Sequence, residues 1–131
     1  FNLLNKKILT KLKKPKIAIW GITYKENTHS IKNSPSINLL EKIYKFDLKI
    51  FDPVVSQISI KNNVFKCEKN PLACIHDADV LCIMNKWNIF KSFPLKILEK
   101  KMKNKIIIDP LCVIEKNNKI KNIKIYTMGK K

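Results

Sequence analysis

The chain has 131 residues, 45% of them hydrophobic, which is the size of one domain with a single core and not the composition of a disordered chain. Its formal net charge is +17, but all 27 basic residues are lysine, and they are spread over every segment. Because nucleic-acid binders rely on arginine for bidentate contacts, we expect a solvated basic surface and no nucleic-acid partner.

The longest apolar runs, at 17–22 and 80–84, are too short to cross a bilayer, so we expect no membrane partner. No charged segment leads into an apolar run and a cleavage site, and the expected location is therefore the cytoplasm. The cysteines show no metal-binding spacing, so we predict free thiols and no metal site. Apolar surroundings predict burial for Cys74 and Cys82, whereas Cys67 and Cys112 carry no such signal.

Residues 1–14 repeat apolar side chains at helical spacing, and Pro15 ends this predicted helix. A short, nearly continuous apolar run over 16–23 is typical of a buried parallel strand, which we expect at the centre of a sheet. A polar stretch follows. Ser34-Pro35 then predicts a helix start, since serine caps a helix and proline is tolerated at its first position. The inward face of this helix is expected to hold Ile37, Leu40, Ile43 and Tyr44.

A strand over 48–51, stopped by Asp52-Pro53, completes a βαβ unit with a right-handed crossover. The same alternation continues to the end of the chain. It predicts an α/β fold, a Rossmann-like, doubly wound parallel sheet of five to six strands in three layers, with an N-terminal helix. The later elements are a short strand at 64–66, a short helix at 70–77, a buried strand at 78–84, a partly helical segment at 90–102, and strands at 105–109 and 123–127.

The loop after the first strand, residues 21–35, is the first candidate for a site, because open α/β sheets bind ligands at the carboxyl ends of their strands. It is long and polar, with two lysines and a helix N-terminus that suit an anionic phosphate. The dinucleotide fingerprint G-x-G-x-x-G is absent, since no glycine lies between Gly21 and Gly129. On these residues alone, a phosphate site and a solvated connector remain equal alternatives.

Other polar residues favour structural roles. His29 and His76 are isolated, which favours surface positions over a metal site or a catalytic triad. Asp52 and Asp109 follow strands, where an aspartate more often caps a turn than acts as a catalytic acid. Trp87 fits packing on the sheet better than a place at a ligand edge.

The segment K-I-A-I-W-G-I-T-Y-K-E-N-T-H-S-I-K-N-S-P, residues 16–35, resembles the signature of the C-terminal UDP-binding domain of the UDP-glucose/GDP-mannose dehydrogenase family. Three later segments resemble that family in the same order: F-D-P at 51–53, the stretch from A-D at 78–79 through K-W-N-I-F at 86–90, and I-I-I-D at 106–109. The resemblance covers nearly the whole chain from residue 16 on. Residues 1–14 would then be the end of a preceding helical linker, and 15–131 the C-terminal domain.

The resemblance implies an NAD-dependent nucleotide-sugar 6-dehydrogenase of polysaccharide biosynthesis, which oxidises a sugar CH2OH to a carboxylate. NAD would be bound mainly by an N-terminal domain, and a homo-oligomer would form through a central helix. Tyr24 and Lys25 fall on the aromatic–lysine pair that binds the substrate nucleotide. Lys32 falls on an arginine that reaches the cofactor. None of the four cysteines matches the catalytic one, so we predict no catalytic residue in this chain and expect it to be inactive alone.

Two departures from the family keep alternatives open. Pro110 and Leu111 stand where the UDP-glucose enzymes have glycine and a substrate-binding arginine, and His29 and Ser30 lie near positions that tend to be acidic. These changes fit another nucleotide sugar, or a non-catalytic remnant or interaction module with the same fold. A nucleic-acid-binding protein is favoured only by the net charge.

Overall fold

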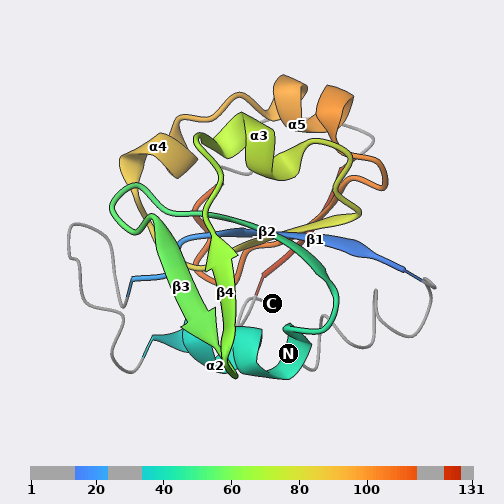
Figure 1. Ribbon diagram of the computed structural model, residues 1–131. Coiled ribbons are helices and arrows are strands. Elements are labelled where there is room, and N and C mark those ends of the chain that lie inside the picture. The colour runs from blue at the N-terminus through green and yellow to red at the C-terminus, as the bar shows by residue number, and fades with distance from the viewer. Residues whose placement is uncertain (1–13, 24–33, 115–122, 128–131) are drawn as a thin grey trace.

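The computed structural model describes residues 14–23, 34–114 and 123–127, and the predicted helix over 1–14 lies almost wholly outside them. The main sheet has five parallel strands in the order β2-β1-β5-β6-β7 (Figure 1). These strands are β1 Lys16–Trp20, β2 Asp47–Phe51, β5 Val80–Ile83, β6 Ile106–Ile108 and β7 Lys124–Tyr126. The predicted doubly wound parallel sheet is confirmed. β1 is an internal strand as expected, although β5 and not β1 holds the middle position.

Helices cover both faces of this sheet (Figure 1). Helix α2, Pro35–Ile43, lies on one face, and the opposite face carries α3 Pro71–Ile75, α4 Asn88–Lys91 and α5 Leu95–Lys101. The predicted helical segment over 90–102 is two short helices because Pro94, at the N-cap of α5, interrupts it. Within the described residues, no helix is long and apolar enough to cross a membrane.

A separate antiparallel hairpin, β3 Gln57–Ile60 and β4 Asn63–Lys66, packs on the α2 side. The short strand predicted at 64–66 is therefore present, but it does not belong to the parallel sheet. Its partner β3 was not predicted from the sequence. The two-residue turn between them has positive φ at Lys61 and Asn62, which is the backbone twist that tight hairpins favour.

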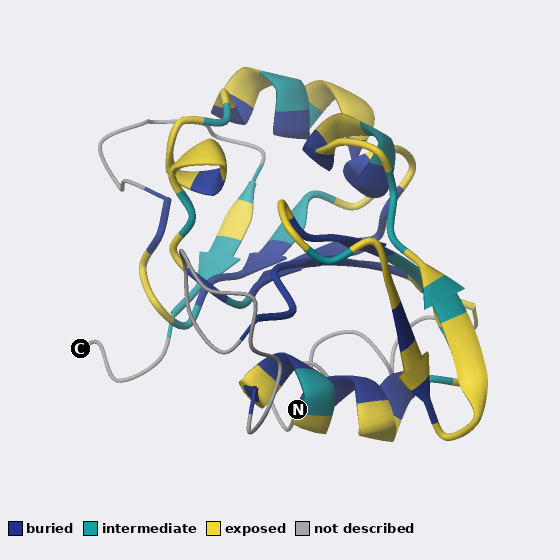
Figure 2. Cartoon of the chain, turned by 60° about the vertical axis from the view of Figure 1, so that its left-hand side comes forward, coloured by how far each residue is buried: buried dark blue, intermediate teal, exposed yellow. Residues whose placement is uncertain are grey.

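The alternation of side chains along β1 divides the core into two clusters. Ile17 and Ile19 pack with Leu40 of α2 and with the hairpin, whereas Ala18 and Trp20 pack beneath α3, α4 and α5. These four strand residues are each at most 1% exposed, which explains why the sequence is apolar without interruption. Figure 2 shows the buried strands between helices whose outer faces are exposed.

The predicted start of α2 is confirmed in detail. Ser34 is the N-cap, its Oγ accepts a hydrogen bond from the Ser36 N–H at 3.1 Å, and Pro35 occupies the first turn. The expected inward face is also confirmed. Leu40 and Ile43 are buried, and Ile37 and Tyr44 pack partly buried against the same cluster.

Candidate functional site at the carboxyl ends of β1 and β5

The order of the strands reverses between β1 and β5. From β1 the chain crosses over α2 to β2 on one side, and β5, β6 and β7 extend from the other side of β1. Helix α2 and helices α3 to α5 consequently lie on opposite faces of the sheet. The switch point lies between them, at the carboxyl ends of β1 and β5. Ligands of open α/β sheets bind at this position. The candidate site is therefore the edge formed by residues 21–23 after β1, residues 84–87 after β5, and the N-terminus of α2.

Gly21 leaves room for the Asn85 side chain directly after β1. Its φ of +98° lies in the left-handed region, which glycine adopts without steric cost. A Cβ built on Gly21 would lie 2.6 Å from Cγ and Oδ1 of Asn85, so the Asn85 side chain occupies the space above this glycine. Gly21 is therefore required both for its backbone angle and for the position of Asn85.

Asp52, directly after β2, joins the loops that follow β1 and β2. Its Oδ2 accepts hydrogen bonds from the N–H groups of Ile22 at 2.7 Å and Thr23 at 3.2 Å. Its Oδ1 accepts from Val54 at 2.9 Å and Val55 at 3.1 Å. The prediction that Asp52 caps a turn is confirmed, and the same carboxylate also fixes the backbone that leaves β1.

Two serines of α2 tie the other end of the candidate loop to its beginning. The Ser34 Oγ donates a hydrogen bond to the Ile22 carbonyl at 2.6 Å, and the Ser36 Oγ donates to the Gly21 carbonyl at 2.6 Å. Both serines are fully buried. Residues 24–33 are therefore bounded by two chain segments that are hydrogen-bonded to each other at the switch point.

Asn85 is the polar side chain at the end of β5. It is 1% exposed, and its Nδ2 donates a hydrogen bond to the Thr23 Oγ1 at 3.1 Å. Its Oδ1 is buried without a hydrogen-bond partner. Asn85 was not predicted as a site residue, although a polar side chain just beyond a fully buried strand is a usable signal in an α/β sheet.

Asp109 ends β6 and caps the turn that follows, as predicted. Its two carboxylate oxygens accept hydrogen bonds from the N–H groups of Val113 at 2.8 Å and Ile114 at 2.9 Å. Burial raises the pKa of this carboxyl above its ordinary value of 3.8, and these two hydrogen bonds act against the rise. Leu111 in this turn is 42% exposed, so its apolar side chain meets solvent.

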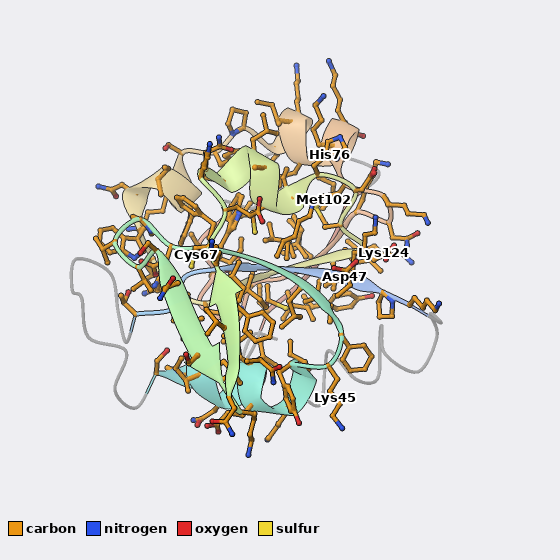
Figure 3. The ribbon with its side chains drawn as sticks, in the orientation of Figure 1. Lys45, Asp47, Cys67, His76, Met102 and Lys124 are labelled. Carbon is orange, nitrogen blue, oxygen red and sulfur yellow. The ribbon has the colours of Figure 1, made fainter. Side chains whose placement is uncertain are left out.

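The residues that the sequence assigned to ligands are not among those the structure describes. Tyr24, Lys25 and Lys32 lie in the range 24–33, as does His29, so their predicted roles stay predictions. His76 is on the surface, close to Asp77. It follows the C-terminal end of α3, away from the candidate edge (Figure 3). Trp87 packs partly buried beneath the helices, which confirms the packing prediction.

The four thiols are free. Cys74 and Cys82 are buried, as predicted, and burial raises the pKa of both, that of Cys82 to about 12. Cys67 lies beside the hairpin (Figure 3) and is half-buried, with its pKa raised to about 11 by burial and by Asp52 and Glu68. None of these three is a ready nucleophile, because the reactive form is the thiolate.

Comparisons with known proteins agree with this arrangement. Residues 18–116 match the UDP-glucose/GDP-mannose dehydrogenase family, UDP binding domain. UDP-glucose 6-dehydrogenase of Rickettsia conorii is 30% identical over 128 residues, which cover 92% of this chain and 29% of that protein. UDP-N-acetyl-D-mannosamine dehydrogenase of Methanococcus vannielii is 30% identical over 112 residues, which cover 81% of this chain and 25% of that protein.

A solved structure shows the same fold. UDP-D-ManNAc dehydrogenase from Pyrococcus horikoshii superimposes with a TM-score of 0.77 at 24% identity, over 98% of this chain and 28% of that one. The chain thus spans between a quarter and a third of the length of these three proteins.

Proposed function

Since the chain belongs to the UDP-glucose/GDP-mannose dehydrogenase family as its UDP-binding domain, we propose that it binds the nucleoside diphosphate of a nucleotide sugar at the switch point between β1 and β5. The observation that carries the proposal is the hydrogen-bonded frame of this edge. Asp52, Ser34 and Ser36 together hold both ends of the 24–33 loop at the carboxyl end of β1. A pyrophosphate there would lie at the positive end of the α2 dipole.

Chain connectivity supports the proposed roles of the two loop lysines. Lys25 is two residues from Thr23, and Lys32 is two residues from Ser34, where the described backbone is fixed. Two residues of extended chain span about 7 Å at most. This spacing is compatible with the proposed roles, in which Tyr24 and Lys25 bind the substrate nucleotide and Lys32 contributes to the cofactor.

The described residues do not fit a complete NAD site. The dinucleotide fingerprint needs two more glycines shortly after the first, and no glycine lies between Gly21 and Gly129. We therefore assign NAD mainly to another domain of a longer protein, with Lys32 as the contribution of this chain. In such a protein, the proposed reaction oxidises a sugar CH2OH to a carboxylate with two NAD⁺ and one water, in the cytoplasm, for polysaccharide biosynthesis. The homo-oligomer predicted through the central helix, and the activity itself, belong to that longer protein.

A non-catalytic nucleotide-binding module is the second candidate, and the exposed Leu111 favours it. Both candidates require nucleotide binding by this chain. They differ in the chemistry, because only the first predicts that joining this chain to an NAD-binding domain with a catalytic cysteine yields NADH from a nucleotide sugar. The chain alone is expected to form none.

Binding is tested by titrating the chain with UDP and following tryptophan fluorescence. Trp20 and Trp87 are the two tryptophans of the sequence and adjoin the switch point. We expect weak binding, of the millimolar class that corresponds to about 4 kcal/mol. Lys25→Ala should weaken it about tenfold or more, because a charge-assisted hydrogen bond contributes about 1.5–3 kcal/mol.

The matched control is Lys45→Ala, which removes the same charge beyond the C-terminal end of α2 (Figure 3). Lys45 is exposed, and its substitution should leave UDP binding unchanged. Equal UDP affinity of the Lys25→Ala variant and the parent chain, or equal losses in both variants, would contradict the proposed site.

A further inference from the structure

Three buried side-chain polar atoms in the described part of the chain lack a hydrogen-bond partner, and all three belong to residues at or just after the carboxyl ends of β1 and β5. They are the Oδ1 of Asn85 and the Nε1 atoms of Trp20 and Trp87. Trp20 is the last residue of β1, and the other two follow β5. Unsatisfied buried polar groups are rare in folded proteins, so their concentration at the switch point points to a partner outside the described chain.

Asn85 is the most informative of the three. Its carboxamide is fixed on one side by the hydrogen bond from Nδ2 to the Thr23 Oγ1, and it lies against the backbone of Gly21. The remaining oxygen can accept hydrogen bonds but receives none. A leucine of similar size would fill the same space without a buried unpaired oxygen, although it would lose the hydrogen bond to the Thr23 Oγ1. Packing alone therefore does not account for asparagine here.

We propose that Asn85 is a specificity-determining residue, whose Oδ1 accepts a hydrogen bond from the nucleoside part of the bound nucleotide. This inference rests on the proposed function. An ionised pyrophosphate carries only acceptors, so the free oxygen of Asn85 cannot recognise it. The matching chemistry is an N–H or O–H donor, and we assign it to the imide N–H of the base or to the 2′-hydroxyl of the ribose.

The contact requires a local opening, because the Asn85 Oδ1 is buried. The unpaired acceptor itself favours this opening, since exposure gives the oxygen a water partner that the closed arrangement denies it. The ligand would thus take over a hydrogen bond that the closed fold leaves unmade.

The test compares UDP, inorganic pyrophosphate, 3-methyl-UDP and 2′-deoxy-UDP as ligands of the parent chain and of Asn85→Leu, by the same fluorescence titration. We expect Asn85→Leu to weaken UDP binding about fivefold, the effect of one neutral hydrogen bond, and to leave pyrophosphate binding unchanged. One of the two modified ligands should bind the parent chain about fivefold more weakly than UDP does. This ligand is 3-methyl-UDP if the donor is the base, and 2′-deoxy-UDP if the donor is the ribose. The affinity of that modified ligand should be the same for the Asn85→Leu variant as for the parent chain.

Several results would overturn the inference. A purely structural Asn85 would weaken UDP and pyrophosphate together. If both modified ligands bind the parent chain as tightly as UDP, neither proposed donor of the nucleoside is recognised. This comparison uses only the parent chain, so it holds even if the Asn85→Leu variant does not fold. If Lys25→Ala weakens UDP binding but Asn85→Leu does not, this inference fails while the proposed function stands. If the parent chain binds neither UDP nor pyrophosphate, both fail.

Discussion

Replacing Asp52 with asparagine tests whether one carboxylate holds together the loops after β1 and β2. Each carboxylate oxygen accepts two backbone N–H groups, those of Ile22 and Thr23 on Oδ2 and those of Val54 and Val55 on Oδ1. An amide keeps only one oxygen. Whichever way it turns, one pair of N–H groups loses its acceptor and faces an NH2 donor.

The expected loss follows from these contacts. Two hydrogen bonds to a charged group contribute about 1.5–3 kcal/mol each, and partial exposure of the loops to water reduces the cost of losing them. We expect Asp52→Asn to lower the free energy of unfolding by about 3 kcal/mol, a large fraction of the about 5–15 kcal/mol typical of a domain. Urea denaturation followed by tryptophan fluorescence measures this loss, and the midpoint should fall while the m-value stays constant.

Asp47→Asn is the matched control for this substitution. Asp47 begins the same strand that Asp52 follows, but its side chain is exposed at the amino edge of the sheet (Figure 3). The same loss of charge there should change the free energy of unfolding by less than about 0.5 kcal/mol. If the two variants unfold at the same urea concentration, Asp52 does not hold the loops as described.

Further predictions concern the same framework. Gly21→Ala should cost about 1–3 kcal/mol from its positive φ alone and more from the clash with Asn85, so a thermal midpoint equal to that of the parent chain would contradict the geometry. Because the pKa of Asp109 is raised on folding, its contribution to stability is present at low pH and is lost as the pH rises through the folded-state pKa. The free energy of unfolding of the parent chain should accordingly fall relative to that of Asp109→Asn as the pH rises from about 4, and a constant difference would refute this. Iodoacetamide should label the exposed Cys112 in the native chain, whereas the buried thiols of Cys74 and Cys82 should react only after the chain has been unfolded. Peptide mass spectrometry identifies the labelled cysteines, and labelling of Cys74 or Cys82 in the native chain would contradict their burial.

The parallel sheet could be predicted from the sequence because both of its faces are covered. Burial on two sides makes β1 and β5 continuous apolar runs, and the Ser34-Pro35 pair marks the start of α2 through its capping hydrogen bond. The capping roles of Asp52 and Asp109 followed from their places at strand ends.

The hairpin and the frame of the site could not be predicted in the same way. β3 buries only Ile58 and Ile60, and its turn uses Lys61 and Asn62 at positive φ without the glycine that usually signals such turns. The contacts of Ser36 and Asn85 depend on how distant segments meet at the switch point; the sequence can mark a polar residue after a strand but not its hydrogen-bond partner.

Amide chemical shifts of the ¹⁵N-labelled chain during titration with UDP test the central claim most directly, because they report where the nucleotide binds. The proposed site predicts that the largest shifts among the described residues occur at Gly21, Thr23, Ser36 and Asn85, around the carboxyl ends of β1 and β5. The largest shifts at the opposite edge, near Lys16 and Lys124, or no shifts at all, would contradict it.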